Sequence, residues 1–197
     1  MTDNHCVKHS LKLVLLLGIS ASLSHAQEEE AAKYVPASFE SQHRLSGVNG
    51  GFEYTATASE TLLRDTSGTE TASIWSTSYI KRERRNDARP VTFVFNGGPG
   101  SASAWLHIGL LGPKVVRVPS RADRDDGAPP YSLADNDQSI FGETDLVFVD
   151  SIGTGYSRPI GAATNEDFWS LNGDTSSMTA FIREWVTANQ RWNSPKY

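Results

Sequence analysis

Two short apolar runs, each ending at a glycine-rich turn, most constrain what this chain can fold into. Residues 90–96 read Pro-Val-Thr-Phe-Val-Phe-Asn, and residues 145–150 read Asp-Leu-Val-Phe-Val-Asp. Runs of this length without polar alternation are typical of strands that are covered on both faces. We therefore predict two buried strands in a sheet covered by helices, which is the α/β class.

Alternating patterns precede the first run. The turn at residues 49–51, Asn-Gly-Gly, is followed by Phe52, Tyr54 and Ala56 at every second position. Residues 71–80 also alternate, with Ile and Ser on one face and Trp, Thr and Tyr on the other. Both segments are predicted to be strands.

A helical pattern lies near the end of the chain. One stripe, at spacings of three and four, consists of Met178, Phe181, Ile182, Trp185, Val186 and Asn189. Asp174 or Thr175 can cap this helix, and residues 193–195, Asn-Ser-Pro, can end it. Residues 196–197 then begin another predicted strand. Because the stripe is almost wholly apolar, we interpret it as core packing against the sheet.

The first 26 residues have the pattern of a signal peptide. Lys8 and Lys12 give a positive start, residues 13–23 are apolar, and Ser-His-Ala then supplies the small residues of a cleavage site. The apolar run is about half of the roughly 20 residues that cross a bilayer. We predict cleavage after Ala26 and a secreted or periplasmic protein with no membrane anchor.

The remaining chain is predicted to contain a linker and one domain. Residues 27–40 start with an acidic run and lack apolar periodicity, so we predict a flexible linker. Residues 41–197 form the predicted domain. The only cysteine, Cys6, would leave with the signal peptide, so the mature protein would have no disulfide.

Composition argues against several classes of function. The formal net charge is −5 and no long basic run occurs, so we expect no nucleic-acid partner. Three of the five histidines lie in the predicted signal peptide, and the other two, His43 and His107, are far apart in sequence. With no cysteine beside them they do not suggest a metal site, and we expect no cofactor.

The loop at residues 96–100, Asn-Gly-Gly-Pro-Gly, directly follows the first buried strand. Its glycines let the backbone turn sharply and let a ligand approach the peptide N–H groups. Two such amides can stabilise an oxyanion, and α/β-hydrolases place half of their oxyanion hole after a strand in this way. Neither phosphate-loop pattern aligns here. A tight turn without a site remains the alternative.

A second glycine turn follows the second buried strand, over residues 150–157, Asp-Ser-Ile-Gly-Thr-Gly-Tyr-Ser. Asp150 can hydrogen-bond the loop amides that follow it. Ser157 lacks the flanking glycines of a nucleophile, and no Gly-x-Ser-x-Gly pattern occurs anywhere in the chain. Neither turn therefore supplies a nucleophile.

Together, the two glycine turns resemble the signature pair of the serine carboxypeptidase family. The resemblance extends through Asp135-Asn136, the strand at residues 145–150 and residues 181–197, and it covers about residues 41–197. It implies the N-terminal portion of an α/β-hydrolase sheet with crossover helices. It also implies a serine-type carboxypeptidase, which releases C-terminal residues from peptides through an acyl-enzyme. The partner would be a peptide with a free C-terminal carboxylate.

The resemblance also assigns roles to residues. Gly98 would donate an oxyanion-hole N–H, while the amide of Gly97 and the side chain of Asn96 would hold the substrate carboxylate. His107 is a further candidate for holding that anion. The family's catalytic serine, aspartate and histidine lie later in its chain, with the nucleophile just beyond Tyr197. We therefore expect the 197 residues alone to be inactive.

One departure from the family pattern keeps other functions open. Many members carry a glutamate before a Gly-Pro pair, where this sequence has Leu110 and Leu111. That change weakens the case for strict carboxypeptidase specificity. The alternatives are an esterase or acyltransferase on the same scaffold, because a fold does not fix a reaction, or a non-catalytic truncated product.

Overall fold

The computed structural model describes residues 34–46, 51–82, 88–97, 100–118 and 129–197. Residues 35–197 form one compact unit of the mixed α/β class, as the sequence predicts. The strands are β1 (Ser38–Leu45), β2 (Phe52–Arg64), β3 (Glu70–Lys81), β4 (Val91–Phe95), β5 (Lys114–Arg117), β6 (Ser132–Asp135), β7 (Asp145–Val149) and β8 (Arg158–Pro159). The helices are α1 (Ala104–Leu106), the π-helix η2 (His107–Leu111), the 3₁₀ helices η4 (Ile140–Gly142) and η5 (Asn165–Asp167), and α2 (Leu171–Ala188).

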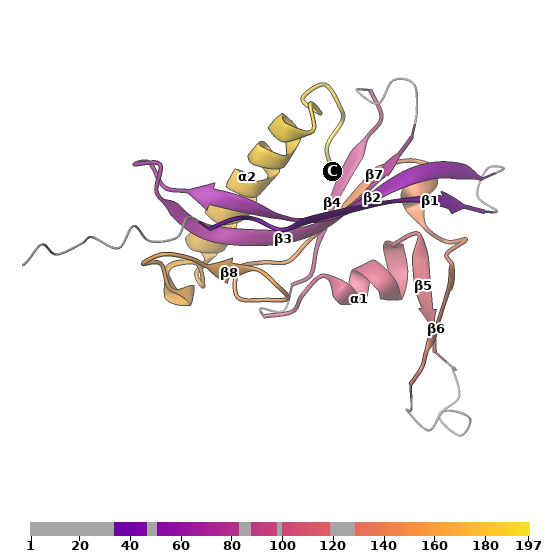
Figure 1. Ribbon diagram of the computed structural model, residues 1–197, viewed down its shortest axis with the longest axis horizontal. Coiled ribbons are helices and arrows are strands. Elements are labelled where there is room, and N and C mark those ends of the chain that lie inside the picture. Colours follow the sequence, from indigo (N-terminus) through magenta and orange to yellow (C-terminus); the bar gives the residue numbers. More distant parts are fainter. Residues whose placement is uncertain (1–33, 47–50, 83–87, 98–99, 119–128) are drawn as a thin grey trace, which may run out of the picture. The chain divides into compact units, whose positions relative to one another are not determined.

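The main sheet is mixed, and its strands follow the order β1-β2-β3-β7-β4, with β8 paired to β3 (Figure 1). Strands β1, β2 and β3 are antiparallel neighbours, and β3 is also antiparallel to β7. Strands β4 and β7 run parallel, with Phe95 opposite Val149. On the other side of β4, a parallel bridge joins Val91 to Lys196, so residues 195–197 run along β4, where the sequence predicts only that another strand begins.

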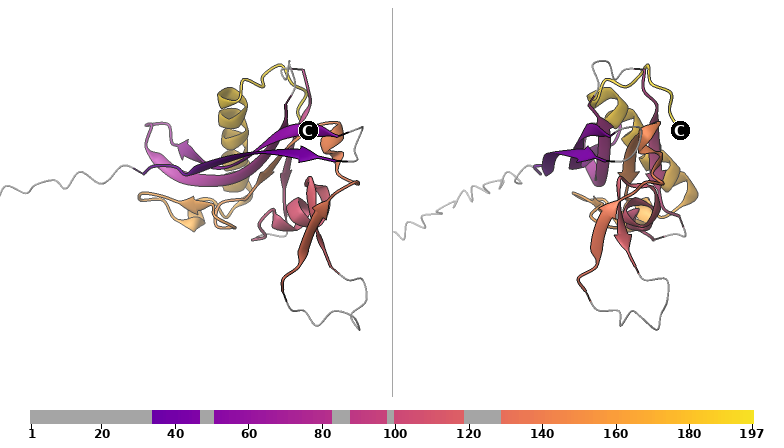
Figure 2. Two further views of the ribbon diagram at one scale, coloured as in Figure 1. Left: turned by 45° about the vertical axis from the view of Figure 1, so that its right-hand side comes forward. Right: turned by 90° about the vertical axis from the view of Figure 1, so that its right-hand side faces the viewer.

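The two faces of the sheet carry separate apolar clusters. Alternate residues of β7 belong to different clusters, because successive side chains of a strand point to opposite faces. Val147 and Val149 pack with α2, whereas Leu146 and Phe148 pack with residues of α1, η2 and η4. Helices thus cover both faces (Figure 2). This explains why the two buried strands lack polar alternation.

Helix α2 begins earlier than the sequence pattern indicates. The predicted caps, Asp174 and Thr175, lie inside the helix, and the Oγ of Ser170 caps it by accepting a hydrogen bond from the N–H of Gly173 at 2.9 Å. A side chain at Gly173 would come within 2.6 Å of the Asp167 carbonyl oxygen, so this glycine allows close packing of the first turn. The predicted core stripe is confirmed by its buried members, which are Met178, Phe181, Trp185 and Val186.

Strand β1 begins within the segment that the sequence predicts to be a linker. Ser38 to Glu40 already pair with β2, and the N–H of Ala37 donates to the Glu60 carboxylate at 2.7 Å. Every residue of β1 except Leu45 is exposed, so its sequence has no apolar periodicity by which to recognise it. The predicted signal peptide lies outside the described residues. Among the residues that are described, no helix has the length and apolar character needed to cross a membrane.

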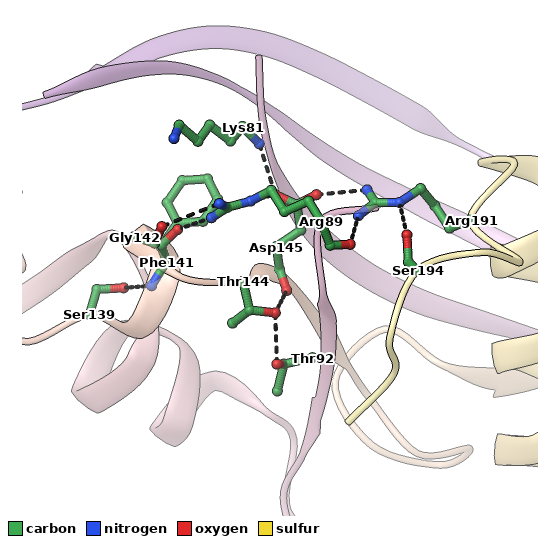
Figure 3. A network of polar contacts seen from close by, with 10 residues as sticks. All are labelled: Lys81, Arg89, Thr92, Ser139, Phe141, Gly142, Thr144, Asp145, Arg191 and Ser194. Carbon is green, nitrogen blue, oxygen red and sulfur yellow. Dashed lines mark hydrogen bonds and ion pairs between the residues drawn. The ribbon is translucent and has the colours of Figure 1, made fainter. Parts of the chain in front are cut away.

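A buried ionic network joins the amino ends of β4 and β7 to the segment after α2 (Figure 3). The carboxylate of Asp145 is fully buried and accepts hydrogen bonds from Arg89 Nε at 2.9 Å and Arg191 Nη1 at 2.6 Å. Arg191 also donates to the Arg89 carbonyl oxygen and to Ser194 Oγ. The network therefore fixes residues 191–194, from which the chain runs alongside β4.

Candidate functional site

The chain path marks the carboxyl ends of β4 and β7 as the place where this sheet can bind a ligand. The connection that leaves β4 passes over the face covered by α1, η2 and η4, and the connection that leaves β7 passes over the face covered by α2. Neighbouring parallel strands whose connections leave toward opposite faces create a topological switch point, where open α/β sheets bind their ligands. The two glycine turns lie at this point.

The first glycine turn begins where β4 ends. Asn96 is half-buried and Gly97 is exposed, so both can meet a ligand. Gly100 has φ +97, a conformation that favours glycine. Gly97 has no such φ, and a Cβ built there has no neighbour within 4 Å among the described residues. Gly98, the predicted oxyanion donor, and Pro99 lie outside the described residues.

The second glycine turn is closed by its own hydrogen bonds. The N–H groups of Gly153 and Ser157 donate to carbonyl oxygens within residues 150–157. Ser157 Oγ donates to the Asp150 carbonyl oxygen at 2.7 Å and accepts from the Trp75 N–H at 2.8 Å. Ser157 is fully buried by these contacts. Its hydroxyl continues the pairing of β3 with β7 and is not presented as a nucleophile, in agreement with the sequence.

A single carboxylate connects the second turn to the segment that follows the first turn. Asp150 Oδ1 accepts a hydrogen bond from the Ser103 N–H and another from Ser103 Oγ, each at 2.8 Å. Ser103 is 5% exposed and Asp150 is 7% exposed, so these bonds are shielded from water. Segments that are about 50 residues apart in sequence are thus held together. No period or motif in the sequence pointed to Ser103, although Asp150 was expected to bond within its own turn.

His107, the remaining substrate-binding candidate, has partners within the sheet packing. Its Nε2 lies 2.6 Å from the Tyr79 hydroxyl, and its ring stacks on Phe148 at a centroid distance of 4.4 Å. Burial lowers the pKa of His107 to about 4, against a smaller upward effect of Asp150. The ring is therefore neutral at pH 7 and has no charge with which to attract a carboxylate. These contacts account for it as a half-buried packing residue.

Exposed aromatic side chains occur on the same segments. Phe95 at the end of β4 is 49% exposed, Trp105 in α1 is 76% exposed, and Tyr156 in the second turn is 71% exposed. Tyr156 also packs on Trp75, with ring centroids 5.2 Å apart. Trp105 and Tyr156 give no sequence signal, because an aromatic side chain in a short helix or a turn has no periodicity, and Phe95 belongs to a run that was predicted to be buried on both faces. They add apolar surface beside the polar groups of the two turns.

Other parts of the described structure offer less to a ligand. A hollow of about 280 Å³ lies between β2, β3 and the start of α2. Its two charged side chains already have partners, since Arg64 pairs with Glu70 and Asp167 accepts from the Thr164 N–H. Within the described ranges, no group of three or more His, Cys, Asp or Glu side chains could hold a metal ion. The switch point is therefore the better candidate site.

Comparison with known proteins leaves the family open. No family model matches the chain, and the search of curated proteins also gave no match.

Proposed function

We propose that this chain forms the substrate-carboxylate and oxyanion part of an exported serine-type carboxypeptidase with an α/β-hydrolase fold. The observation that carries the proposal is that the two glycine turns, residues 96–100 and 150–157, follow the carboxyl ends of adjacent parallel strands, with Ser103, just after the first turn, hydrogen-bonded to Asp150 in the second. The serine carboxypeptidase resemblance rests on the same two segments. Their position at a switch point follows from the path of the chain and is independent of that resemblance.

The path of residues 195–197 supports the same proposal. These residues run parallel to β4 on the side away from β7, with hydrogen bonds from Val91 and Phe93 N–H to the carbonyl oxygens of Pro195 and Tyr197. A strand continuing in this direction ends at the same edge of the sheet as Asn96. The resemblance puts the nucleophile just after Tyr197, and such a nucleophile would reach the first glycine turn.

The proposed chemistry divides the work among few groups. The Asn96 side-chain NH₂ and the Gly97 N–H donate to the C-terminal carboxylate of the peptide. The serine gives its hydroxyl proton to the base as its oxygen attacks the last peptide carbonyl, and the Gly98 N–H donates to the oxyanion that forms. The C–N bond then breaks, the released amine takes a proton from the base, and water hydrolyses the acyl-enzyme. The serine and the base come from sequence that the resemblance puts beyond residue 197.

A binding experiment on the 197-residue chain tests the carboxylate part of the proposal. N-acetyl-Phe-Leu as the free acid is titrated against the ¹⁵N-labelled protein, with the matching C-terminal amide as the control ligand. We expect the acid to shift the amide signals of Asn96 and Gly97 and to bind at least about tenfold more tightly than the amide, since a charge-assisted hydrogen bond is worth about 1.5–3 kcal/mol. Equal binding of the two, or no binding, would refute carboxylate recognition.

One observation favours an esterase or acyltransferase as the second candidate. Leu110, one of the two leucines in the stretch where many carboxypeptidases of the family carry a glutamate, is 56% exposed, and its carbonyl oxygen accepts from Asn136 Nδ2 at 2.7 Å. This position therefore contributes no carboxyl group to a network that reads a free acid. Tighter binding of N-acetyl-Phe-Leu methyl ester than of the acid would favour the second candidate.

A further inference from the structure

We infer that Asp150 is a positioning residue, whose carboxylate holds Ser103 beside the second glycine turn and so limits the movement of the segment that carries Asn96 and Gly97. The inference deepens the proposed function and rests on it only for what this segment binds. The contacts themselves are independent of the ligand.

Hydrogen bonds fix the backbone of Asp150 independently of the contacts that its side chain makes. Its N–H donates to the Trp75 carbonyl oxygen at 3.1 Å, and its carbonyl oxygen accepts from Ser157 Oγ at 2.7 Å. Both partners belong to parts of the sheet that are already packed, since β3 is a central strand and Ser157 is fully buried. The backbone of Asp150 is therefore a rigid base from which its carboxylate can orient another segment.

The two carboxylate oxygens of Asp150 contact different turns. Oδ1 accepts both hydrogen bonds of Ser103, which ends the stretch that begins at Asn96. Oδ2 occupies the space where a side chain of Gly155 would stand, 1.8 Å from the ideal Cβ position. Gly155 also has φ +50. Glycine at position 155 thus makes room for the carboxylate and adopts a backbone conformation that other residues rarely take.

The chain is held on both sides of the first turn. At one end, Phe95 is paired with Val149 in the sheet, and at the other end Ser103 is bonded to Asp150. The helix that follows Ser103 is only three residues long, and the Ser103 side chain makes no capping bond within it. The Ser103 carbonyl oxygen accepts from the His107 N–H at 2.9 Å, whereas its N–H and its hydroxyl both donate to Asp150. Removing the carboxylate would free one end of the segment that carries Asn96 and Gly97.

A positioning role and a purely electrostatic role predict opposite changes in peptide-acid affinity for Asp150→Ala. A buried negative charge beside a carboxylate site repels the ligand, so if charge were all that mattered, both Asp150→Asn and Asp150→Ala would tighten the binding of a peptide acid. If Asp150 positions the turn, Asp150→Ala weakens binding. Asp150→Asn keeps an oxygen that can accept from Ser103 and therefore restores binding.

The test uses hydrogen exchange and ligand binding on the full chain. The variants are Asp150→Ala, Asp150→Asn and Ser103→Ala. Asp65→Ala is the matched control, because Asp65 makes similar hydrogen bonds to Ser67 and Thr69 in the distant β2–β3 turn.

We expect Asp150→Ala to speed amide exchange at residues 101–105 about tenfold or more, the loss expected for hydrogen bonds to a charged group, with β7 unchanged. The affinity for N-acetyl-Phe-Leu should fall about tenfold, Asp150→Asn should stay within about threefold of the wild type, and Ser103→Ala should lie between them. The Asp65→Ala control should change neither readout.

Several outcomes would overturn the inference. These are unchanged exchange at residues 101–105 in Asp150→Ala, equal acceleration there and in β7, or tighter binding in both Asp150 variants. If Asp150→Ala does not fold, Ser103→Ala decides, and unchanged local exchange in that variant would refute the positioning role. If the wild type fails to bind N-acetyl-Phe-Leu, the proposed function is wrong. The hydrogen-exchange data then still test whether Asp150 positions residues 101–105.

Discussion

Replacing Asp145 by asparagine should destabilise this protein more than almost any other isosteric change. The carboxylate is fully buried between two guanidinium groups whose side chains are 9% exposed for Arg89 and 3% exposed for Arg191. In Asp145→Asn, one oxygen can still accept from Arg89 and the Lys81 N–H, which bond to the same Oδ1. The new amide NH₂ would then face Arg191 Nη1, which lies 2.6 Å from Oδ2, with donor against donor.

The magnitude follows from what is left unpaired. Removing one partner of a buried ion pair costs about 3–5 kcal/mol, because the remaining charge stays out of water without compensation. That is a large share of the roughly 5–15 kcal/mol that stabilise a typical domain. With a urea m-value of about 2 kcal/mol/M, the unfolding midpoint should fall by roughly 2 M.

Equilibrium urea unfolding, followed by tryptophan fluorescence, measures this change. Glu70→Gln is the matched control, since Glu70 pairs with Arg64 at 2.7 Å but the Arg64 side chain is 50% exposed. We expect the control to lose less than about 1 kcal/mol. A loss below about 1 kcal/mol for Asp145→Asn as well would refute the reasoning, because Asp145 would then contribute no more than an exposed ion pair.

Three further predictions concern the site, His107 and export. Gly97→Ala should leave the free energy of unfolding unchanged or raise it by up to about 1 kcal/mol, yet weaken peptide-acid binding at least about tenfold. Gly109→Ala is the control, because a Cβ at Gly109 also meets no described atom within 4 Å. Unchanged binding in Gly97→Ala would contradict a ligand at Gly97. His107, whose pKa burial lowers to about 4, binds a proton more readily when unfolded, so stability should be full above pH 6.5 and fall by up to about 3 kcal/mol as the pH drops toward 4. Urea unfolding at pH 7 and pH 4.5 should show this loss for the wild type but a smaller one for His107→Gln. N-terminal sequencing of exported protein should start at Gln27, and an intact Met1 would refute the signal peptide.

The buried strands and the packed face of α2 could be predicted because they are local. Residues 90–96 and 145–150 were predicted as strands, and β4 (Val91–Phe95) and β7 (Asp145–Val149) differ from these ranges by no more than one residue at either end. Continuous burial on both faces selects apolar side chains at every position, which leaves a strong signal in the sequence. The apolar stripe of α2 is visible for the same reason.

Strand β1 and the Ser103–Asp150 contact could not be predicted, because neither produces a pattern among residues that are close in sequence. The first three residues of β1 read as the end of a linker because only Leu45 of this edge strand is buried, although its backbone pairs along its whole length with β2. Ser103 and Asp150 are 47 positions apart, and only the parallel pairing of β4 with β7 brings them together. His107 was a candidate ligand for an anion because it lies in the stretch where the resemblance expects a glutamate. Its partners, Tyr79 and Phe148, lie on other elements, so no local pattern showed its packing role.

The glycines of the two turns look alike in the sequence, yet the structure gives them different reasons to be glycine. Gly100 has φ +97, and Gly155 has φ +50 and makes room for the Asp150 carboxylate, so the local backbone explains both. Gly97 has neither a positive φ nor a neighbour within 4 Å of its ideal Cβ among the described residues. Its missing side chain leaves open space beside Asn96, at the switch point of the sheet. In the proposed function, a ligand that approaches the peptide N–H gives a physical reason for glycine at position 97.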